Sequence, residues 1–390
     1  MLPVDELEAR KNRLPSLTGM RFLAAFFVFL CHTSFQGFLA DTRLQGTLQD
    51  WLLKAGWAGV QFFFVLSGFV LTWAARPGDT ARAFWRRRAA KLYPANLVTC
   101  ALAIVLLLAT GGALTAERAL PNLLLVQSWV PDYPAFDGLN PPSWSLCCEV
   151  LFYALFPVLL RLVNRIPARR LWWTAGGVFG FMLLMPSVAT ALPTHPMLAD
   201  ITPFPRFWFV YAFPLTRVAD FALGILLARI VLSGRWIRVG LLPATAVAAV
   251  SFVITVAAPV LYSMTATMAV GLFLVIGAGA AGDLGHRPSL LNGRRMRWLG
   301  EVSFAFYMVH VLVLTYGHRA LGNGAWSLPV ALAVCAALFL VTLGAAALLL
   351  RFVERPAMKY LSRKRAPEAQ ERIPVFEPPV LPRVRELVRS

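Results

Sequence analysis

The chain has 390 residues, of which 58% are hydrophobic and only 14% are charged, and its formal net charge is +18. This composition excludes an ordinary soluble domain, in which about a quarter of the residues are charged. With a mean hydropathy of +0.65, it predicts a membrane protein that crosses the bilayer several times. The basic residues lie between apolar runs, where topology signals lie, which argues against a nucleic-acid partner.

Apolar runs close to the length of a bilayer span recur along the chain. We expect an all-α protein with about ten transmembrane helices and both termini cytoplasmic. The predicted spans are residues 17–39, 55–74, 92–110, 143–163, 171–190, 207–230, 239–260, 264–281, 299–317 and 328–351. Under this topology thirty of the 37 Lys and Arg residues are cytoplasmic and five are external, as the positive-inside rule requires.

The segments outside the spans complete the predicted organisation. We expect a cytoplasmic N-terminal segment (1–16), a transmembrane domain (17–356) and a cytoplasmic, Pro-rich, disordered tail (357–390), in a protein of the cell membrane. Residues 111–142, rich in Pro, Gly and Asp, predict an ordered loop or a re-entrant cap. The start of the chain does not have the pattern of a cleaved signal peptide, and we find no internal repeat and no appended soluble domain. The five cysteines predict free buried thiols without a metal site.

The first span contains two ionisable residues, Arg21 and His32. Eleven residues separate them, so they share one helix face and lie roughly 16 Å apart along the axis. A charged residue at the centre of a span costs about 2.5–3.5 kcal/mol on insertion scales, which favours a functional reading. The pattern suits a long substrate with an anionic end at Arg21 and a reacting end at His32. The alternatives are an arginine that extends to the headgroups and a hydrogen-bonded core histidine.

Polar groups also interrupt the second and third spans. Ser67 and Gly68 break an aromatic run, which suits close helix packing or a substrate passage. The stretch FWRRRAAKLYP brings Arg88 and Lys91 to the start of the third span. Topology alone explains two or three basic residues there, and a phosphate-bearing ligand at the inner surface would also require several.

Glu149, in the fourth span, is the deep carboxylate of the chain. Counting from the outer ends of their spans places Glu149 and His32 at similar depth. A histidine oriented by a carboxylate is a common general base, so we expect Glu149 to contact His32. Arg217 and Asp220 are spaced i, i+3, which predicts an internally compensated structural pair.

The ninth span places Ser303, Tyr307 and His310 on one helix face. His310 lies near mid-depth and is the second candidate for proton transfer.

These stretches, in this order, resemble the membrane-bound acyltransferase family 3, which includes bacterial O-antigen and peptidoglycan O-acetylases and macrolide O-acyltransferases. The resemblance covers roughly residues 14–356. The matching motifs are Arg-x10-His at Arg21 and His32, FF-x-x-SG at Ser67, R-x-x-R-x-YP at Arg88, Lys91 and Tyr93, W-S-L-x-x-E at Trp144, Ser145 and Glu149, and S-x-x-x-Y-x-x-H at Ser303, Tyr307 and His310. Lysine replaces the second arginine of the basic motif, which removes a bidentate phosphate contact but keeps the charge.

The resemblance implies transfer of an acyl group from acyl-CoA to a hydroxyl. It implies that His32 assists the transfer and that Arg21, Arg88, Lys91 and Tyr93 hold the donor from the cytoplasmic side, with no tightly bound cofactor. We expect direct attack, with Glu149 orienting His32 and a polar group such as Ser67 or Tyr307 near the thioester oxygen. A covalent route through Cys147 or Cys148 is disfavoured, because burial makes a thiol a poorer nucleophile.

The acceptor is the open question at this level. The compact layout is similar to that of the macrolide O-acyltransferases and favours a secondary-metabolite hydroxyl, on a macrolide or ansamycin. The alternative is a glycan or sugar of the cell surface. A proton-coupled transporter is a third hypothesis, but the sequence lacks the inverted repeat that many transporters have. An inactive structural membrane protein is a fourth hypothesis.

Overall fold

The computed structural model describes residues 14–75, 78–195, 197–198 and 201–361. Residues 1–13 of the predicted N-terminal segment (1–16) and residues 362–390 of the predicted tail (357–390) lie outside the described residues. The structure therefore leaves both of these predictions open.

A helix lies in each of the ten ranges predicted to span the membrane. They are α2 (Pro15–Ser34), α3 (Thr42–Trp73), α4 (Ala81–Ala109), α7 (Trp144–Asn164), α8 (Leu171–Ala189), α10 (Pro214–Leu232), α11 (Leu241–Ala257), α13 (Ala269–Leu284), α14 (Arg294–Ala320) and α15 (Leu328–Leu349). The shorter elements are α5 (Ala116–Leu124), α6 (Tyr133–Asp137), η1 (Pro141–Ser143), η2 (Ala168–Arg170), β1 (Met197–Leu198), β2 (Thr202–Pro203), α9 (Phe204–Phe207), η3 (Trp208–Ala212), α12 (Val260–Ser263), η4 (Leu290–Asn292), η5 (Leu350–Glu354) and α16 (Arg355–Leu361). The described chain is nearly all helical, as predicted, apart from the antiparallel pair β1–β2.

Seven helical stretches of the described chain are long and apolar enough to cross a membrane. They are Pro15–Ser34, Thr42–Trp73, Ala81–Ala109, Pro141–Asn164, Ala168–Ala189, Arg294–Ala320 and Leu328–Leu361. Of the others, α11 and α13 are shorter, with 17 and 16 residues, and α10 carries three charged residues. The protein therefore has several membrane-crossing helices, whereas ten crossings and cytoplasmic termini stay predictions.

Helices α3 and α4 begin earlier than predicted, because side-chain caps start them outside the apolar runs. The Asp41 carboxylate accepts a backbone N–H at 2.9 Å in the first turn of α3. The Thr80 hydroxyl does the same at 3.2 Å in α4. Such caps satisfy backbone donors that a helix start leaves free. As a result, Arg88 and Lys91 lie inside α4, one turn apart on the same face.

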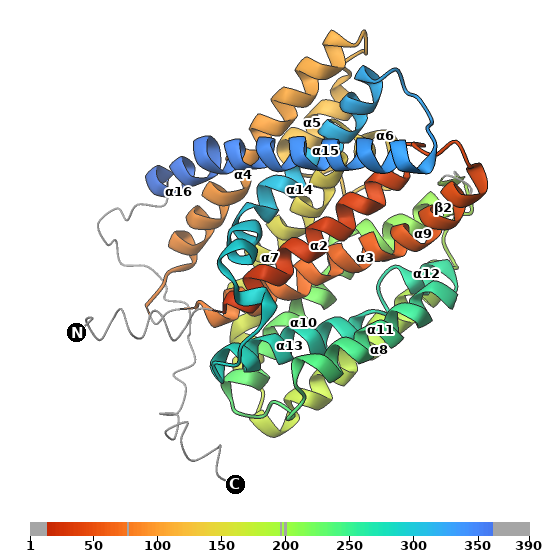
Figure 1. Cartoon of the computed structure of the whole chain (residues 1–390). Helices are drawn as coiled ribbons and strands as arrows, with labels where there is room; N and C mark the ends of the chain where they lie inside the picture. The colour runs from red at the N-terminus through yellow and green to blue at the C-terminus, as the bar shows by residue number, and fades with distance from the viewer. Residues whose placement is uncertain (1–13, 76–77, 196, 199–200, 362–390) are drawn as a thin grey trace.

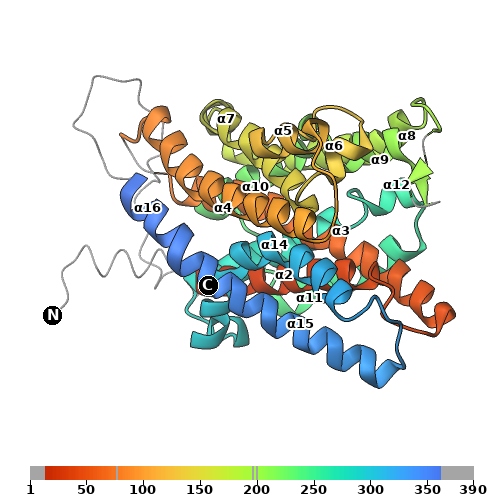
Figure 2. The same cartoon turned by 90° about the horizontal axis from the view of Figure 1, so that it is seen from above.

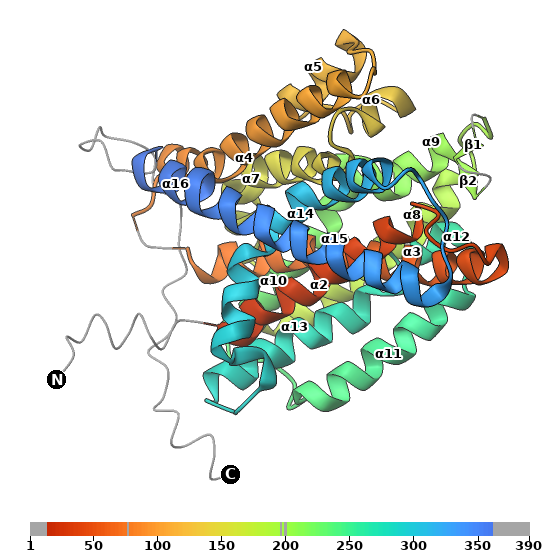
Figure 3. The same ribbon diagram turned by 45° about the horizontal axis from the view of Figure 1, so that its top comes forward.

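The centre of the molecule consists of α2, α3, α10 and α14. Helix α3 packs against both α2 and α10, and α14 packs against α2. Figure 1 shows α8, α11 and α13 on one side of this centre and α4 and α5 on the opposite side. Figures 2 and 3 show α15 and α16 continuing as one long rod along the outside of α14. Residues that line a site between α2, α3 and α14 are thus supplied by the most enclosed helices.

The segment 111–142, here called the cap, is ordered and packs against the second half of α14. The buried Asn140 side chain donates a hydrogen bond to the Met308 carbonyl of α14 at 2.9 Å. Within the segment, the Asn122 amide donates to the Ala135 carbonyl at 3.0 Å. A buried amide keeps such bonds because an unsatisfied polar group is costly. The cap therefore positions the part of α14 that carries Tyr307 and His310.

Two glycines allow α3 and α10 to touch through their backbones. A methyl group added at Gly68 would lie 2.0 Å from the Phe221 carbonyl oxygen. One added at Gly224 would lie 1.9 Å from the Val65 carbonyl oxygen. Small residues at helix crossings are the usual means of close approach in membrane proteins. For Gly68, the close-packing interpretation is confirmed.

We predict that Gly68→Ala destabilises the protein, because the added methyl group meets a main-chain oxygen that cannot rotate away. The expected loss is about 1–3 kcal/mol, the usual cost of overpacking. Thermal unfolding in detergent measures it. Gly176→Ala in α8 is the matched control, since no atom lies within 4 Å of a methyl group added there. Equal melting temperatures for Gly68→Ala and the control would contradict this account of the crossing.

Candidate functional site

Two histidines from different helices meet at the centre of the candidate site. The Nδ1 atom of His32, on α2, lies 3.2 Å from the Nε2 atom of His310, on α14. The same Nδ1 atom lies 2.9 Å from the Val28 carbonyl oxygen. The Nδ1 atom of His310 lies 2.6 Å from the Tyr307 carbonyl oxygen. His310 is buried, with 1% of its surface exposed, whereas His32 is partly exposed.

The carbonyl groups determine where the protons of the two rings lie. A carbonyl oxygen only accepts, so Nδ1 of His310 carries a proton and, in the neutral ring, Nε2 has a free lone pair. Nδ1 of His32 then carries its own proton, which it shares between His310 Nε2 and the Val28 carbonyl. This assignment leaves Nε2 of His32 unprotonated. A neutral imidazole oriented in this way is a general base.

The predicted contact between Glu149 and His32 is wrong. The Glu149 carboxylate accepts a hydrogen bond from the Tyr153 hydroxyl at 2.8 Å, at spacing i, i+4 on α7. Ser145 of α7 and Tyr307 of α14 meet at one level, with their hydroxyl oxygens 2.9 Å apart. The two helices run in opposite directions from there, which separates Glu149 and His310 by roughly 10 Å in depth.

Most of the predicted site residues line one cavity of about 110 Å³, here called the inner cavity. It lies between α2, α3, α4, α7 and α14. Its lining includes Arg21, Ser67, Arg88, Lys91, Ser145, Glu149, Tyr153, Phe304 and Tyr307. On α14 the lining ends at Tyr307, one turn before His310. The cavity thus joins a cationic end at Arg21, Arg88 and Lys91 to a hydroxyl pair next to the histidines.

Aromatic rings support the cations of the inner cavity. The Arg88 guanidinium lies 5.7 Å from the Phe84 ring centroid and 6.0 Å from that of Tyr153. The Lys91 ammonium lies 5.7 Å from the Phe304 ring centroid. Such contacts stabilise cations that have left water. Tyr153, which also binds Glu149, was missed in the sequence, although its i, i+4 spacing from Glu149 was a readable signal.

Besides the two histidines, His32 and His310, three residues of the matching motifs are not among those that line the inner cavity. Tyr93 is 37% exposed on the outer face of α4. Trp144 packs its ring against Phe64 and Tyr211, so it is a core residue. Ser303 donates to the Gly300 carbonyl at 2.8 Å within α14. For these three the structure gives packing or helix-internal contacts.

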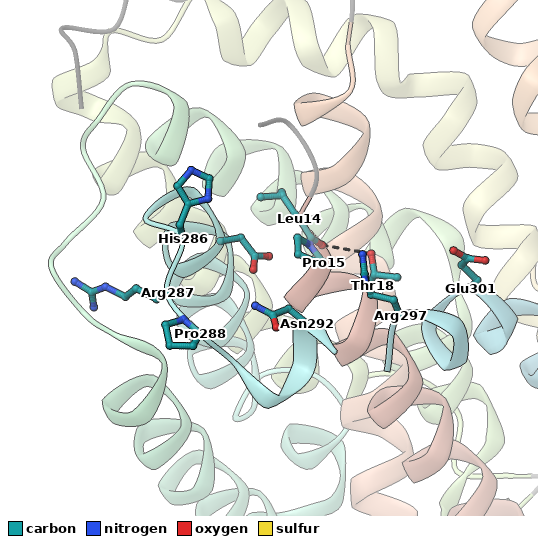
Figure 4. Close-up of a pocket in the computed structure, with 10 residues that line it drawn as sticks. Leu14, Pro15, Thr18, His286, Arg287, Pro288, Asn292, Arg297 and Glu301 are labelled. Carbon is teal, nitrogen blue, oxygen red and sulfur yellow. Dashed lines mark hydrogen bonds between the residues drawn. The ribbon is translucent and has the colours of Figure 1, made fainter. Parts of the chain in front are cut away.

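A second cavity, of about 870 Å³, opens where α2 and α14 begin, and is here called the surface cavity. Leu14, Pro15 and Thr18 of α2 line it, together with the α13–α14 connection and the first turns of α14 (Figure 4). The other lining residues are Asp283 in the last turn of α13, His286, Arg287, Pro288 and Asn292 of the connection, and Arg297 and Glu301 of α14. This cavity could not be predicted from residue patterns, because an irregular connection forms one wall.

Arg217 and Asp220 form the buried pair that their spacing predicts. The Arg217 Nε atom lies 3.2 Å from the Asp220 Oδ2 atom, and each side chain is 1% exposed. The Gln61 amide donates to the other Asp220 oxygen at 2.8 Å. The Arg217 guanidinium lies 5.0 Å from the Phe64 ring centroid and 5.3 Å from that of Tyr211. The pair therefore ties α10 to α3 beside the inner cavity.

Comparison with known proteins agrees with this arrangement. A family described as "Acyltransferase domain", acyltransferase family 3, matches residues 14–350. The chain belongs to this family. It is therefore an acyltransferase enzyme, and the family match together with the apolar helices makes it a multi-pass membrane protein.

Individual relatives of this acyltransferase differ in length. Acyltransferase MdmB from Streptomyces mycarofaciens is 40% identical over 367 residues, which cover 91% of this chain and 94% of that protein. Nodulation protein 10 from Rhizobium leguminosarum bv. viciae is 28% identical over 369 residues, 87% of this chain and 92% of that protein. Peptidoglycan O-acetyltransferase OatA from Listeria monocytogenes is 27% identical over 167 residues, 38% of this chain and 24% of that protein. No solved structure matches the chain.

We predict that Arg217→Met destabilises the protein by about 3–5 kcal/mol, because it leaves the buried Asp220 carboxylate without its partner. The double variant Arg217→Met/Asp220→Asn removes both charges and keeps an acceptor for Gln61, so it should recover most of the loss. Thermal unfolding of the two variants in detergent measures the difference. If the double variant is no more stable than Arg217→Met, unpaired charge is not the cause.

Proposed function

We propose that this protein is an O-acyltransferase of the cell membrane that moves an acyl group from acyl-CoA to a hydroxyl of a secondary metabolite, such as a macrolide or ansamycin. The observation that carries the proposal is the His32–His310 contact, which leaves Nε2 of His32 free as a base. The cationic end of the inner cavity lies on the same face of α2, at Arg21.

His32 acts on the acceptor hydroxyl. Its Nε2 atom removes the hydroxyl proton as the oxygen attacks the thioester carbonyl carbon, which forms a tetrahedral intermediate. The C–S bond then breaks, and the departing coenzyme A sulfur takes the proton from His32. The ester and free coenzyme A are the products, and the histidine returns to its neutral form. The Val28 carbonyl and His310 Nε2 both accept from Nδ1 of His32, which keeps its ring in the tautomer that this step requires.

The cationic end of the inner cavity suits the phosphates nearest to the pantetheine arm of the donor. Arg21, Arg88 and Lys91 supply three positive groups there, against the single carboxylate of Glu149 among the lining residues. Guanidinium groups bind phosphate oxygens through two hydrogen bonds. Arg21 and His32 are roughly 16 Å apart along α2, a span that an extended arm can follow. The thioester would then reach the histidines while the phosphates stay at Arg21.

Two further features support direct attack. Cys147 and Cys148 are fully buried and are not among the residues that line either cavity. The Cys148 thiol donates to the Ala212 carbonyl at 3.5 Å. Of the two predicted groups near the thioester oxygen, Tyr307 is favoured over Ser67, because Tyr307 lies one turn from His310. Its hydroxyl donates to the Pro142 carbonyl at 3.0 Å and would turn toward the donor.

The choice of acceptor rests on length and resemblance. The chain matches nearly the whole of Acyltransferase MdmB, whereas it matches only a quarter of the peptidoglycan O-acetyltransferase OatA. This favours a compact enzyme with a small-molecule acceptor. The OatA match still makes acylation of a cell-surface glycan the second candidate.

The test is transfer of radiolabelled acetyl from acetyl-CoA by purified protein, with a panel of macrolide, ansamycin and sugar acceptors. We expect label on one acceptor, and a loss of roughly 100-fold or more in rate for His32→Ala, which removes the base. Thr33→Ala is the control, since the Thr33 hydroxyl donates to the Phe29 carbonyl of its own helix. Equal transfer by His32→Ala would remove His32 from the mechanism. Label on a sugar alone would select the second candidate.

A further inference from the structure

We infer that the surface cavity binds the phosphorylated nucleotide end of acyl-CoA. The inference rests on the donor named in the proposed function and assigns to that donor a second subsite. This subsite lies outside the membrane-buried motif residues, between the start of α2, the α13–α14 connection and the start of α14.

The volumes of the two cavities differ in the way that this donor requires. Ligand pockets usually measure about 300–1,000 Å³. The inner cavity, at about 110 Å³, holds a thin chain but not a nucleotide. The surface cavity, at about 870 Å³, falls within the usual range. A donor with a bulky head and a narrow arm matches this pair of volumes.

Consecutive turns of the same two helices line both cavities. On α2, Leu14 and Thr18 line the surface cavity and Arg21, one turn further, lines the inner cavity. On α14, Glu301 lines the surface cavity and Phe304, one turn further, lines the inner cavity. These residues share one face of each helix, because they are spaced three or four apart. A ligand can therefore extend from the surface cavity past Arg21 toward His32.

The carboxylates of the surface cavity are already compensated. Asp283 accepts hydrogen bonds from the Ser16 backbone N–H at 2.9 Å and from the Ser16 hydroxyl at 2.6 Å, which fixes the start of α2. Glu301 lies 3.1 Å from the guanidinium of Arg355. The acidic groups therefore do not exclude an anion from the cavity.

The arginines of the surface cavity are available to a phosphate. Arg287 and Arg297 are exposed, and neither makes an ion pair with a carboxylate of the described chain. Figure 4 shows them on opposite sides of Asn292, with Arg297 beside Thr18 and Arg287 on the far side. With the phosphates next to the pantetheine arm at Arg21, these two guanidinium groups suit the remaining 3′-phosphate of the coenzyme A nucleotide.

An anionic lipid headgroup shares this phosphate chemistry, since the cavity opens at the predicted inner membrane surface. A nucleotide and a lipid headgroup can be told apart by the pair of compounds that the arginines distinguish. A nucleotide subsite distinguishes coenzyme A from dephospho-coenzyme A, which lacks the 3′-phosphate. A lipid subsite distinguishes phosphatidylglycerol from phosphatidylcholine and is indifferent to the donor.

The experiment compares binding of coenzyme A, dephospho-coenzyme A and pantetheine by calorimetry to the full chain in phosphatidylcholine nanodiscs, with and without phosphatidylglycerol. We expect wild type to prefer coenzyme A over dephospho-coenzyme A by about tenfold or more, the effect of one charge-assisted phosphate contact. Arg287→Ala/Arg297→Ala should lose this preference and keep its affinity for pantetheine. Arg294→Ala/Arg295→Ala is the matched control: it removes the same charge from residues that are not among the lining set, and should keep the preference.

Three outcomes would overturn the inference. A full preference for coenzyme A in Arg287→Ala/Arg297→Ala would exclude a nucleotide subsite here. Loss of bound phosphatidylglycerol in that variant, with the donor preference intact, would assign the cavity to lipid. Failure of the wild-type protein to bind coenzyme A would reject the donor named in the proposed function. This outcome can be distinguished from the first two, because each of those requires that the wild-type protein binds coenzyme A.

Discussion

The contact between His32 and His310 is the interaction on which the rest of the site depends. It joins two residues that are 278 positions apart in sequence, one on α2 and one on α14. The contact stays short only if neither helix shifts along its axis relative to the other. Backbone contacts prevent such a shift. A methyl group added at Gly300 would lie 1.9 Å from the Thr18 carbonyl oxygen, so the two helices touch near their starts. Near the middle of α14, Asn140 of the cap binds the Met308 carbonyl. His310 follows two residues after Met308, so this contact holds α14 close to the histidine pair.

Charge compensation explains how an arginine is tolerated in the first helix. A lone charge at the centre of a span costs about 2.5–3.5 kcal/mol on insertion scales. Arg21 shares the inner cavity with Glu149, and Arg88 and Lys91 lie over aromatic rings. The carboxylate of Glu354 also interacts with Arg21 and Lys91, so three cations face two carboxylates. One positive charge remains in excess, and an anionic ligand would neutralise it. The cavity is therefore compensated best with its ligand bound, as expected of a binding site rather than of a structural ion pair such as Arg217–Asp220.

The features that depend on periodicity and composition, above all the positions of the helices, could be predicted from the sequence. Apolar runs located the ten long helices of the described residues. The motifs that resemble those of the family singled out Arg21, Ser67, Lys91 and Glu149, which line one cavity in the structure. Counting residues from helix ends failed for Glu149, because α7 and α14 run in opposite directions and the level at which they meet is set by the Ser145–Tyr307 contact. The partner of His32 was missed for the same reason.

The surface cavity could not be predicted, since its walls depend on the path of the α13–α14 connection and on the Asp283–Ser16 bonds. Neither a helical period nor a motif reports such a path. Regular elements were thus readable from the sequence, whereas contacts between helices and irregular connections required the three-dimensional structure.

The measurement that tests the central claim most directly is kcat for acyl transfer in His310→Gln and His310→Leu, alongside KM for acyl-CoA. If His310 orients His32, the leucine variant loses roughly 100-fold in kcat, on the scale of general-base catalysis, with KM for the donor unchanged. The glutamine variant keeps much of the rate, because its amide oxygen can accept the Nδ1–H of His32. Wild-type kcat in the leucine variant would contradict the account, because the orientation of His32 would then not depend on His310.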